Sequence, residues 1–239
     1  MMIKKYIPDA ITSMNLVCGI IGVVFAFKGR FDLAFPLMLL AAVFDFLDGF
    51  AARALGAYSD FGKELDSLCD LVSFGVLPSV MLYSLMKVCM FSEAWYCWIP
   101  LVIALFSALR LAKFNIDERQ HSSFLGLPTP ACAMLCGSLC YYVAHDPSCF
   151  LSTWASGPVF IPLLSVILAA LLVCEIPMFS LKMHKDDPQP LKVKRLAMLG
   201  IVVAAILVAV FCKLDWSFVV LVTFTLYILK NIVYRIFGI

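Results

Sequence analysis

Four aspartates, Asp45, Asp48, Asp66 and Asp70, lie within 26 residues of a strongly apolar sequence. Asp45 and Asp48 are three residues apart and Asp66 and Asp70 are four apart, so each pair would lie on one face of a helix. Four carboxylates gathered at one level would repel one another unless cations held them. Oxygen ligands of this kind favour Mg²⁺ or Mn²⁺, and paired ions suit phosphoryl chemistry. The spacing therefore predicts a site for two divalent metal ions.

Gly49 and Arg53 extend this pattern towards a phosphate-containing substrate. Gly49 would allow close approach to the backbone beside the acids, and Arg53 follows Asp48 by five residues, near enough to meet the same phosphate. A pyrophosphate substrate would fit both residues. The simpler alternative is that the acids only pair with Arg53, Lys63 and other basic residues in an ion network, but four regularly spaced acids exceed what pairing needs.

The elements that position these acids are predicted to be membrane helices. The 239 residues are 63% hydrophobic and 14% charged, against roughly a quarter charged in soluble domains. We expect an all-α, polytopic membrane bundle that fills residues 1–239 as one domain. The apolar segments long enough to span a bilayer number about eight: Ile7–Phe27, Phe31–Leu55, Leu65–Met86, Trp95–Phe114, Leu127–Ala144, Pro158–Leu181, Leu196–Cys212 and Trp216–Phe237.

The basic residues predict the orientation of these helices. Of the 18 Lys and Arg residues, 14 fall on the side that holds both termini and only Lys28, Arg30, Lys87 and Lys213 fall on the other. Since positive residues collect on the cytoplasmic side, both termini and the aspartates are expected to face the cytoplasm from the plasma (inner) membrane. The net charge of +2 adds little, and no nucleic-acid partner is expected.

Three cysteines form a stripe at helical spacing, Cys132, Cys136 and Cys140. Such a stripe could in principle ligate a metal ion, but no histidine continues the stripe at its spacing of four residues to complete the site. Most of the ten cysteines fall inside predicted spans, so a disulfide framework is not expected. We interpret the stripe as small side chains at a helix contact.

Together the acids spell D-x-x-D-G-x-x-A-R-x8-G-x3-D-x3-D, from Asp45 to Asp70. This pattern resembles the signature of the CDP-alcohol phosphotransferase family. Within that family the chain is similar to phosphatidylserine synthases of bacterial and archaeal type. The segments that carry this likeness begin at Pro8, Ser73, Ala108 and Phe124, so the resemblance covers about residues 8–145. The helices at about 158–237 carry no assigned motif.

The resemblance implies a reaction of CDP-diacylglycerol with L-serine that gives phosphatidylserine and CMP. It implies that Asp45, Asp48 and Asp66 bind metal, and that Asp70 is both a ligand and the base that accepts the proton of the attacking hydroxyl. It further places five residues at donor-binding positions, namely Gly49, Arg53, Ser59, Thr12 and Asn15. Membrane lipids are expected partners, and relatives suggest a homodimer. Position 9 is more often Asn than Asp in the family, which changes the expected contact with the nucleotide.

Serine carries a carboxylate, which predicts a cation in the acceptor pocket. Arg110 and Lys113 lie at the cytoplasmic end of the fourth predicted span, level with the aspartates. The alternative for both residues is ordinary anchoring at the cytoplasmic boundary.

Other functions remain open at the level of sequence. Glycerol phosphate, inositol or choline could replace serine, and ether lipids could replace diacylglycerol. An aspartate-rich membrane prenyltransferase would carry its acids on well separated spans, whereas these lie within 26 residues. A metal transporter would place them near the bilayer midplane, whereas these are expected at one boundary.

Overall fold

The structure is a computed structural model that describes residues 3–90, 94–116, 124–178 and 215–237. It is a helix bundle, as predicted, with one small antiparallel strand pair. The helices are α1 (Ile3–Phe27), α2 (Phe31–Leu55), α3 (Asp60–Asp70), α4 (Leu77–Met90), α5 (Val102–Ile116), α6 (Thr129–His145), α7 (Phe150–Ala155), α8 (Phe160–Val173) and α10 (Trp216–Phe237). The π-helical turn η1 (Leu71–Val76) joins α3 to α4, and the 3-10 helix η2 (Trp95–Leu101) leads into α5.

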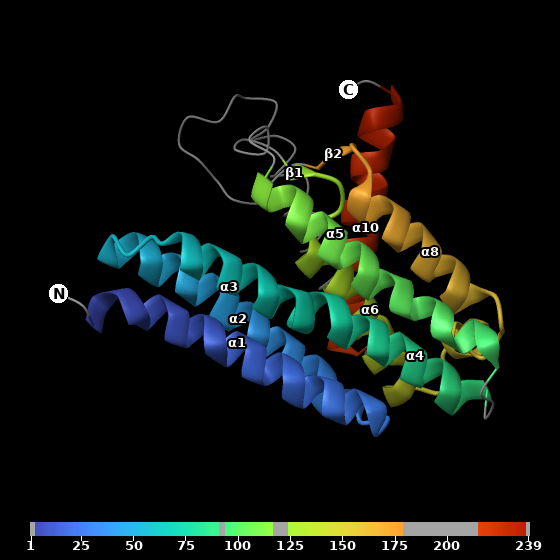
Figure 1. Ribbon diagram of the computed structural model, residues 1–239. Helices are drawn as coiled ribbons and strands as arrows, with labels where there is room; N and C mark the ends of the chain where they lie inside the picture. Colours follow the sequence, from blue (N-terminus) through green and yellow to red (C-terminus); the bar gives the residue numbers. More distant parts are fainter. Residues whose placement is uncertain (1–2, 91–93, 117–123, 179–214, 238–239) are drawn as a thin grey trace.

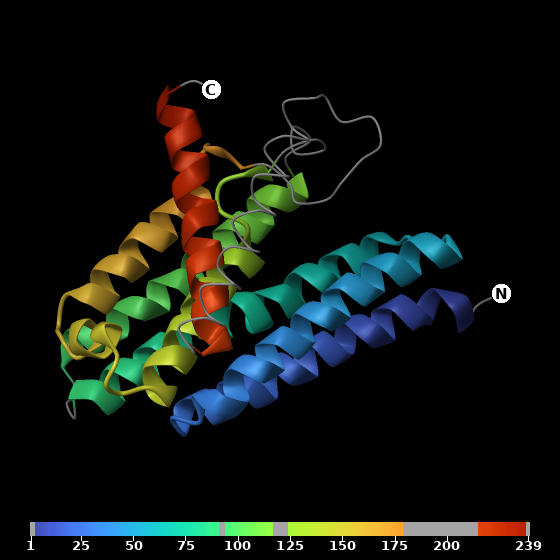
Figure 2. The ribbon, with the colours of Figure 1, turned by 180° about the vertical axis from the view of Figure 1, so that it is seen from behind.

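The long helices are arranged in two groups. Helices α1 and α2 run side by side with the continuous α3–η1–α4 helix, and α5, α6, α8 and α10 form the rest of the bundle (Figure 1). Figure 2 shows the same arrangement from behind, with α10 against α6. The beginning of α1, the end of α2 and the beginning of α3 meet at one end of the first group (Figure 1). This end therefore brings together the segments that carry the four aspartates.

The helix that contains Asp66 and Asp70 is longer than predicted. The expected span Leu65–Met86 is part of a continuous helix from Asp60 to Met90, which begins early because Ser59 caps it: the Ser59 hydroxyl accepts a 2.9 Å hydrogen bond from the Gly62 amide. The π-helical turn follows directly after Asp70. Such turns inside α-helices are frequent at functional sites.

The sixth predicted span is wrong at its C-terminal end. We expected a helix over Pro158–Leu181, but α8 ends at Val173 and Cys174 is extended. The chain then forms β2 (Pro177–Met178), which pairs with β1 (Phe124–Leu125). The amides of Gly126 and Leu127 also donate to the carbonyls of Ile176 and Leu171. Hydrogen bonds to the segment before α6 thus replace the helical bonds, which apolarity alone could not reveal.

The described residues include five helices long and apolar enough to cross a membrane, and α8 is a shorter apolar helix. Large apolar side chains are exposed along the outer faces, as with Val43, Phe46 and Phe50 on α2. Helix α6 is instead almost wholly buried, and Cys132, Cys136 and Cys140 are fully buried within it, in agreement with a packing role. The predicted span Leu196–Cys212 lies outside the described residues, so the number of spans and the side of the termini stay predictions.

Candidate active site

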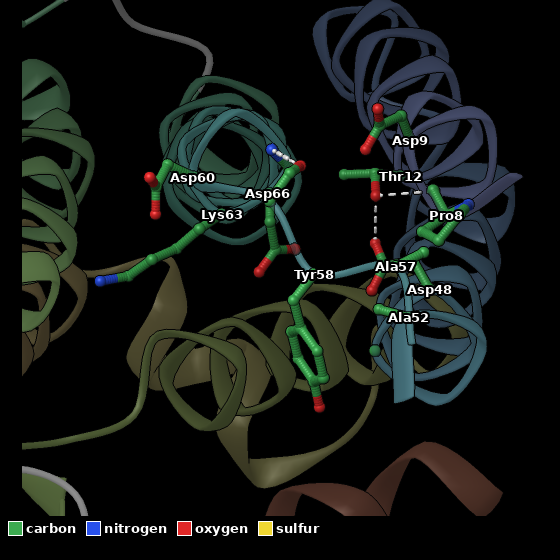
Figure 3. A pocket seen from close by; sticks show the side chains of 13 residues that line it. Pro8, Asp9, Thr12, Asp48, Ala52, Ala57, Tyr58, Asp60, Lys63 and Asp66 are labelled. Carbon is green, nitrogen blue, oxygen red and sulfur yellow. Dashed lines mark hydrogen bonds between the residues drawn. The ribbon is translucent and has the colours of Figure 1, made fainter. Parts of the chain in front are cut away.

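Three of the four aspartates converge as the spacing predicted. Carboxylate oxygens of Asp45 and Asp48 from α2 and of Asp66 from α3 all lie within 4.8 Å of one another. These residues fit a divalent ion, because hard oxygen donors from three side chains meet at a single point on the protein. The carboxylates of Asp48 and Asp66 approach each other from neighbouring helices in Figure 3.

Asp48 is held by a residue of the first helix. The Thr12 hydroxyl on α1 lies 2.6 Å from Oδ2 of Asp48, and it is also 3.0 Å from the carbonyl oxygen of Pro8 (Figure 3). Both Thr12 and Asp48 are buried. A short hydrogen bond from a hydroxyl to a carboxylate fixes the carboxylate's orientation. Helix α1 thus supports the ligand set without contributing a carboxylate to it.

Asp70 is not among the three carboxylates that meet within 4.8 Å in the described part of the chain. It is buried one helical turn beyond Asp66, and its Oδ1 accepts a 3.0 Å hydrogen bond from Nδ2 of Asn15. The charges of Asp45 and Asp66 lie near enough to act on it. Ser73 in the π-helical turn donates a 3.1 Å hydrogen bond to the backbone carbonyl of Asn15, which ties α1 to the turn that follows Asp70. Its surroundings therefore differ from those of the three clustered carboxylates.

A pocket of about 490 Å³ opens beside the acids. Its lining comes from α1, the end of α2, the connecting turn and the start of α3: Pro8, Asp9, Thr12, Asp48, Gly49, Ala52, Ala57, Tyr58, Ser59, Asp60, Gly62, Lys63 and Asp66. This volume is in the range of small-molecule sites. Because Asp48 and Asp66 lie on its wall, a molecule in the pocket would meet ions held by the carboxylates (Figure 3).

The predicted donor-binding residues occupy distinct places around this pocket. A Cβ atom at Gly49 would meet only the Arg53 guanidinium, at 3.7 Å and 3.9 Å, so packing within the protein does not require glycine there. The space beside Gly49 is open to the pocket. Arg53 is exposed on the last turn of α2, with its guanidinium near Gly49. Ser59 lines the pocket but also caps α3, and Asn15 contacts Asp70.

Arg110, predicted to bind the acceptor, is buried on α5. Its Nη1 donates a 3.1 Å hydrogen bond to Oγ1 of Thr129, the first residue of α6. Its Nε is buried and has no hydrogen-bond partner among the described residues. The guanidinium lies within electrostatic range of Asp70. A buried cation with an unused donor is a good candidate to bind an anionic ligand.

Lys113 has a different environment from Arg110. Its Nζ forms a 3.2 Å ion pair with Glu175, just after α8, and the side chains of Lys113 and Glu175 are 40% and 66% exposed. Nearby, Asn115 donates hydrogen bonds to Ser67 and Glu64, and Lys63 donates to the Asn115 carbonyl. These contacts connect the end of α5 to α3. They give Lys113 and Asn115 structural partners.

Comparison with known proteins agrees with this geometry. A sequence model described as CDP-alcohol phosphatidyltransferase matches residues 5–176, which include every residue of the aspartate cluster and its pocket. The chain belongs to this family. Members of the CDP-alcohol phosphatidyltransferase family depend on divalent metal, and the clustered aspartates supply suitable ligands.

Three curated relatives of this family are each named CDP-diacylglycerol–serine O-phosphatidyltransferase. The Bacillus subtilis protein is 38% identical over 130 residues, 54% of this chain and 72% of the relative. The Methanocaldococcus jannaschii protein is 37% identical over 137 residues, 57% of this chain and 61% of the relative. The Mycobacterium leprae protein is 33% identical over 215 residues, 86% of this chain and 68% of the relative.

Sequence reasoning about this phosphatidyltransferase missed several pocket and support residues. Tyr58 and Lys63 line the pocket, yet an exposed tyrosine in a turn and a lysine at a membrane boundary carry no specific signal. Thr129 lies in a segment that carried the family resemblance, but its contact with Arg110 depends on how α5 packs against α6. Their roles could not be read from spacing along the chain.

Proposed function

We propose that this protein transfers the phosphatidyl group of CDP-diacylglycerol to the hydroxyl of L-serine, giving phosphatidylserine and CMP. Family membership and the names of the three relatives support the reaction class and both substrates. The observation that carries the proposal is the meeting of Asp45, Asp48 and Asp66 at the wall of the 490 Å³ pocket. Mg²⁺ or Mn²⁺, as a pair, are the ions proposed for these carboxylates.

The nucleotide head of the donor is placed in the pocket between α1, α2 and α3. Pyrophosphate oxygens would then lie beside Gly49, where no side chain fills the space, and within reach of the Arg53 guanidinium. An arginine neutralises phosphate charge through a planar set of donors. Divalent ions, when bound, would neutralise the remaining phosphate charge and help the CMP oxygen to leave. Thr12, Asn15 and Ser59 support this pocket by fixing Asp48, Asp70 and α3.

Asp70 is assigned as the proton acceptor. Its position one helical turn beyond Asp66, held by Asn15, supports this role, and the metal contact that the resemblance also implies for Asp70 is proposed to be loose, because a carboxylate that binds metal tightly is a weak base. The serine hydroxyl oxygen forms a bond to the phosphorus that carries the diacylglycerol. The bond from this phosphorus to the CMP oxygen breaks, and the hydroxyl proton passes to Asp70. Asn15 holds Asp70 through the 3.0 Å hydrogen bond to Oδ1.

Arg110 is assigned to the carboxylate of serine. The carboxylate must approach a region that already holds several negative charges, and a fixed cation offsets that repulsion. The unpartnered Nε of Arg110 and its proximity to Asp70 support this assignment. Lys113 is proposed to contribute only to the charge at the mouth of the site, since it pairs with Glu175.

The protein is an integral membrane protein by the length and apolarity of its helices. We place it in the plasma (inner) membrane with the active site facing the cytoplasm, where serine and CDP-linked lipids are available, and propose that it acts as a homodimer. The excess of basic residues on the side of the aspartates supports this orientation.

The test is CMP release by purified protein supplied with CDP-diacylglycerol and one alcohol at a time: L-serine, glycerol phosphate, inositol or choline. Serine alone is expected to give rapid CMP release and a phosphatidylserine product that mass spectrometry can identify. Faster release with another alcohol would reject serine as the acceptor. No release with any alcohol, by protein that retains its helical circular dichroism, would reject the reaction.

A further inference from the structure

Among the described residues, the buried Arg110 guanidinium has a hydrogen-bond partner on one side only. Its side chain is 7% exposed, and Nη1 bonds to Thr129 while Nε faces no acceptor. A buried guanidinium normally has its donors satisfied, so the unused edge points to a ligand. The residue that binds Nη1 of Arg110 therefore determines the direction in which Nε points.

Thr129 is well placed to fix Nη1 because it cannot move easily. It is fully buried, and it follows Pro128 at the start of α6, the most deeply packed helix. The backbone just before it is also tied to α8 by the hydrogen bond from the Leu127 amide to the Leu171 carbonyl. The hydroxyl acceptor for Arg110 thus has a fixed position in the bundle.

The last helix reaches the same region. Helix α10 packs along α6 (Figure 2), and its Tyr227 is buried at 3% exposure. The Tyr227 phenol and the Arg110 guanidinium lie close enough for each to act electrostatically on the other. The Tyr227 carbonyl also accepts a 2.7 Å hydrogen bond from Nδ2 of Asn231. Helix α10 lies beyond residue 176, where the family match ends.

We propose that Thr129 and Tyr227 are positioning residues that aim the free edge of Arg110 at the carboxylate of the acceptor, so that α10 takes part in acceptor selection. This inference rests on the proposed transfer to serine and on Arg110 as its carboxylate partner. Neither residue touches the donor pocket, whose lining comes from α1, α2, the connecting turn and α3. Their removal should therefore change acceptor binding without changing donor binding.

The experiment compares Thr129→Val, Thr129→Ser and Tyr227→Phe with the wild-type enzyme. Phosphatidylserine formation is measured against L-serine concentration, and again with added serinol, a competing alcohol that lacks the carboxylate. Tyr142→Phe is the matched control, since Tyr142 is also a buried tyrosine at the contact of α6 with α10, where it packs on Phe218. Saturation by CDP-diacylglycerol is measured for every variant.

Thr129→Val is expected to raise the serine KM at least about fivefold, within the range for a hydrogen bond to a charged group, and Tyr227→Phe is expected to change it in the same direction. Inhibition by serinol, the donor KM and kcat at saturating serine should stay within about twofold, the pattern of lost acceptor binding alone. Thr129→Ser should restore the wild-type KM. The Tyr142→Phe control should behave as wild type.

Two results would overturn the inference while leaving the proposed function in place. One is an unchanged serine KM in both Thr129→Val and Tyr227→Phe. The other is equal weakening of serine, serinol and donor, which would show a general packing role. Wild-type protein that releases no CMP with serine would instead reject the proposed function, and the inference with it.

Discussion

Removing the Thr12 hydroxyl tests whether α1 acts through the metal ligands or through the nucleotide. Thr12→Val keeps the shape of the side chain but deletes the 2.6 Å hydrogen bond to Oδ2 of Asp48. A hydrogen bond to a charged group contributes about 1.5–3 kcal/mol, and each 1.4 kcal/mol is about tenfold in an equilibrium constant. Partners that orient metal ligands commonly change metal affinity by about 10- to 100-fold. We therefore expect the half-saturating Mg²⁺ concentration to rise at least about tenfold.

The assay is CMP release as a function of Mg²⁺ at saturating CDP-diacylglycerol and serine. Thr12→Ser, which retains the hydroxyl, should lie near the wild type. Ser13→Ala is the matched control, because among the described residues the neighbouring Ser13 hydroxyl bonds to the Asp9 carbonyl alone, at 2.8 Å, on the exposed side of α1. It should leave metal saturation unchanged.

The reasoning would be refuted if Thr12→Val left metal saturation unchanged. A raised KM for CDP-diacylglycerol with unchanged metal saturation would show that Thr12 serves the nucleotide directly. This was the role implied by the sequence resemblance. The two readouts therefore separate the predicted donor contact from the contact with Asp48 that the structure describes.

Three further predictions test the rest of the site. Asp66→Asn or excess EDTA should abolish CMP release. The control Asp32→Asn should not, because Asp32 lies at the other end of α2 and pairs with Arg30. Activity of the folded protein in EDTA would exclude a metal mechanism. Arg53→Ala should weaken CDP-diacylglycerol use by at least about 1.5 kcal/mol in kcat/KM, with partial recovery in Arg53→Lys, and unchanged donor saturation would make Arg53 only an anchor. Gly19→Ala should lower the melting temperature and the activity together, because the new Cβ would overlap the Ser73 hydroxyl, which bonds to the Asn15 carbonyl. Unchanged melting temperature and activity would show that the π-helical turn adapts to the new side chain.

The helical membrane bundle could be predicted because its cause is local. Runs of apolar residues long enough to span a bilayer must satisfy their backbone hydrogen bonds within the segment, and a helix does so. For this reason α1, α2 and α10 lie close to their predicted positions. The end of α8 was mispredicted because Cys174 to Met178 leave the helix to bond with the segment before α6, which is distant in sequence.

The aspartate cluster could also be predicted from the spacing of the residues. Asp45, Asp48 and Asp66 lie on two helices joined by a short turn, so helical geometry and chain connectivity nearly suffice to bring them together. The surroundings of Asp70 could not be predicted in this way. It depends on Asn15 of α1, 55 residues earlier, and on the π-helical turn after it.

The sequence by itself determined that the protein lies in a lipid bilayer and which helices carry its acids. It also determined the metal-binding chemistry that those acids support. These follow from apolar run lengths and from residues three or four apart on a helix, which are short-range properties of the chain. Only the tertiary structure decided which partners orient the acids, how far the pocket extends and that α10 comes near Arg110. The physical reason is that these features arise where helices distant in sequence pack together, and many packings satisfy the same apolar pattern.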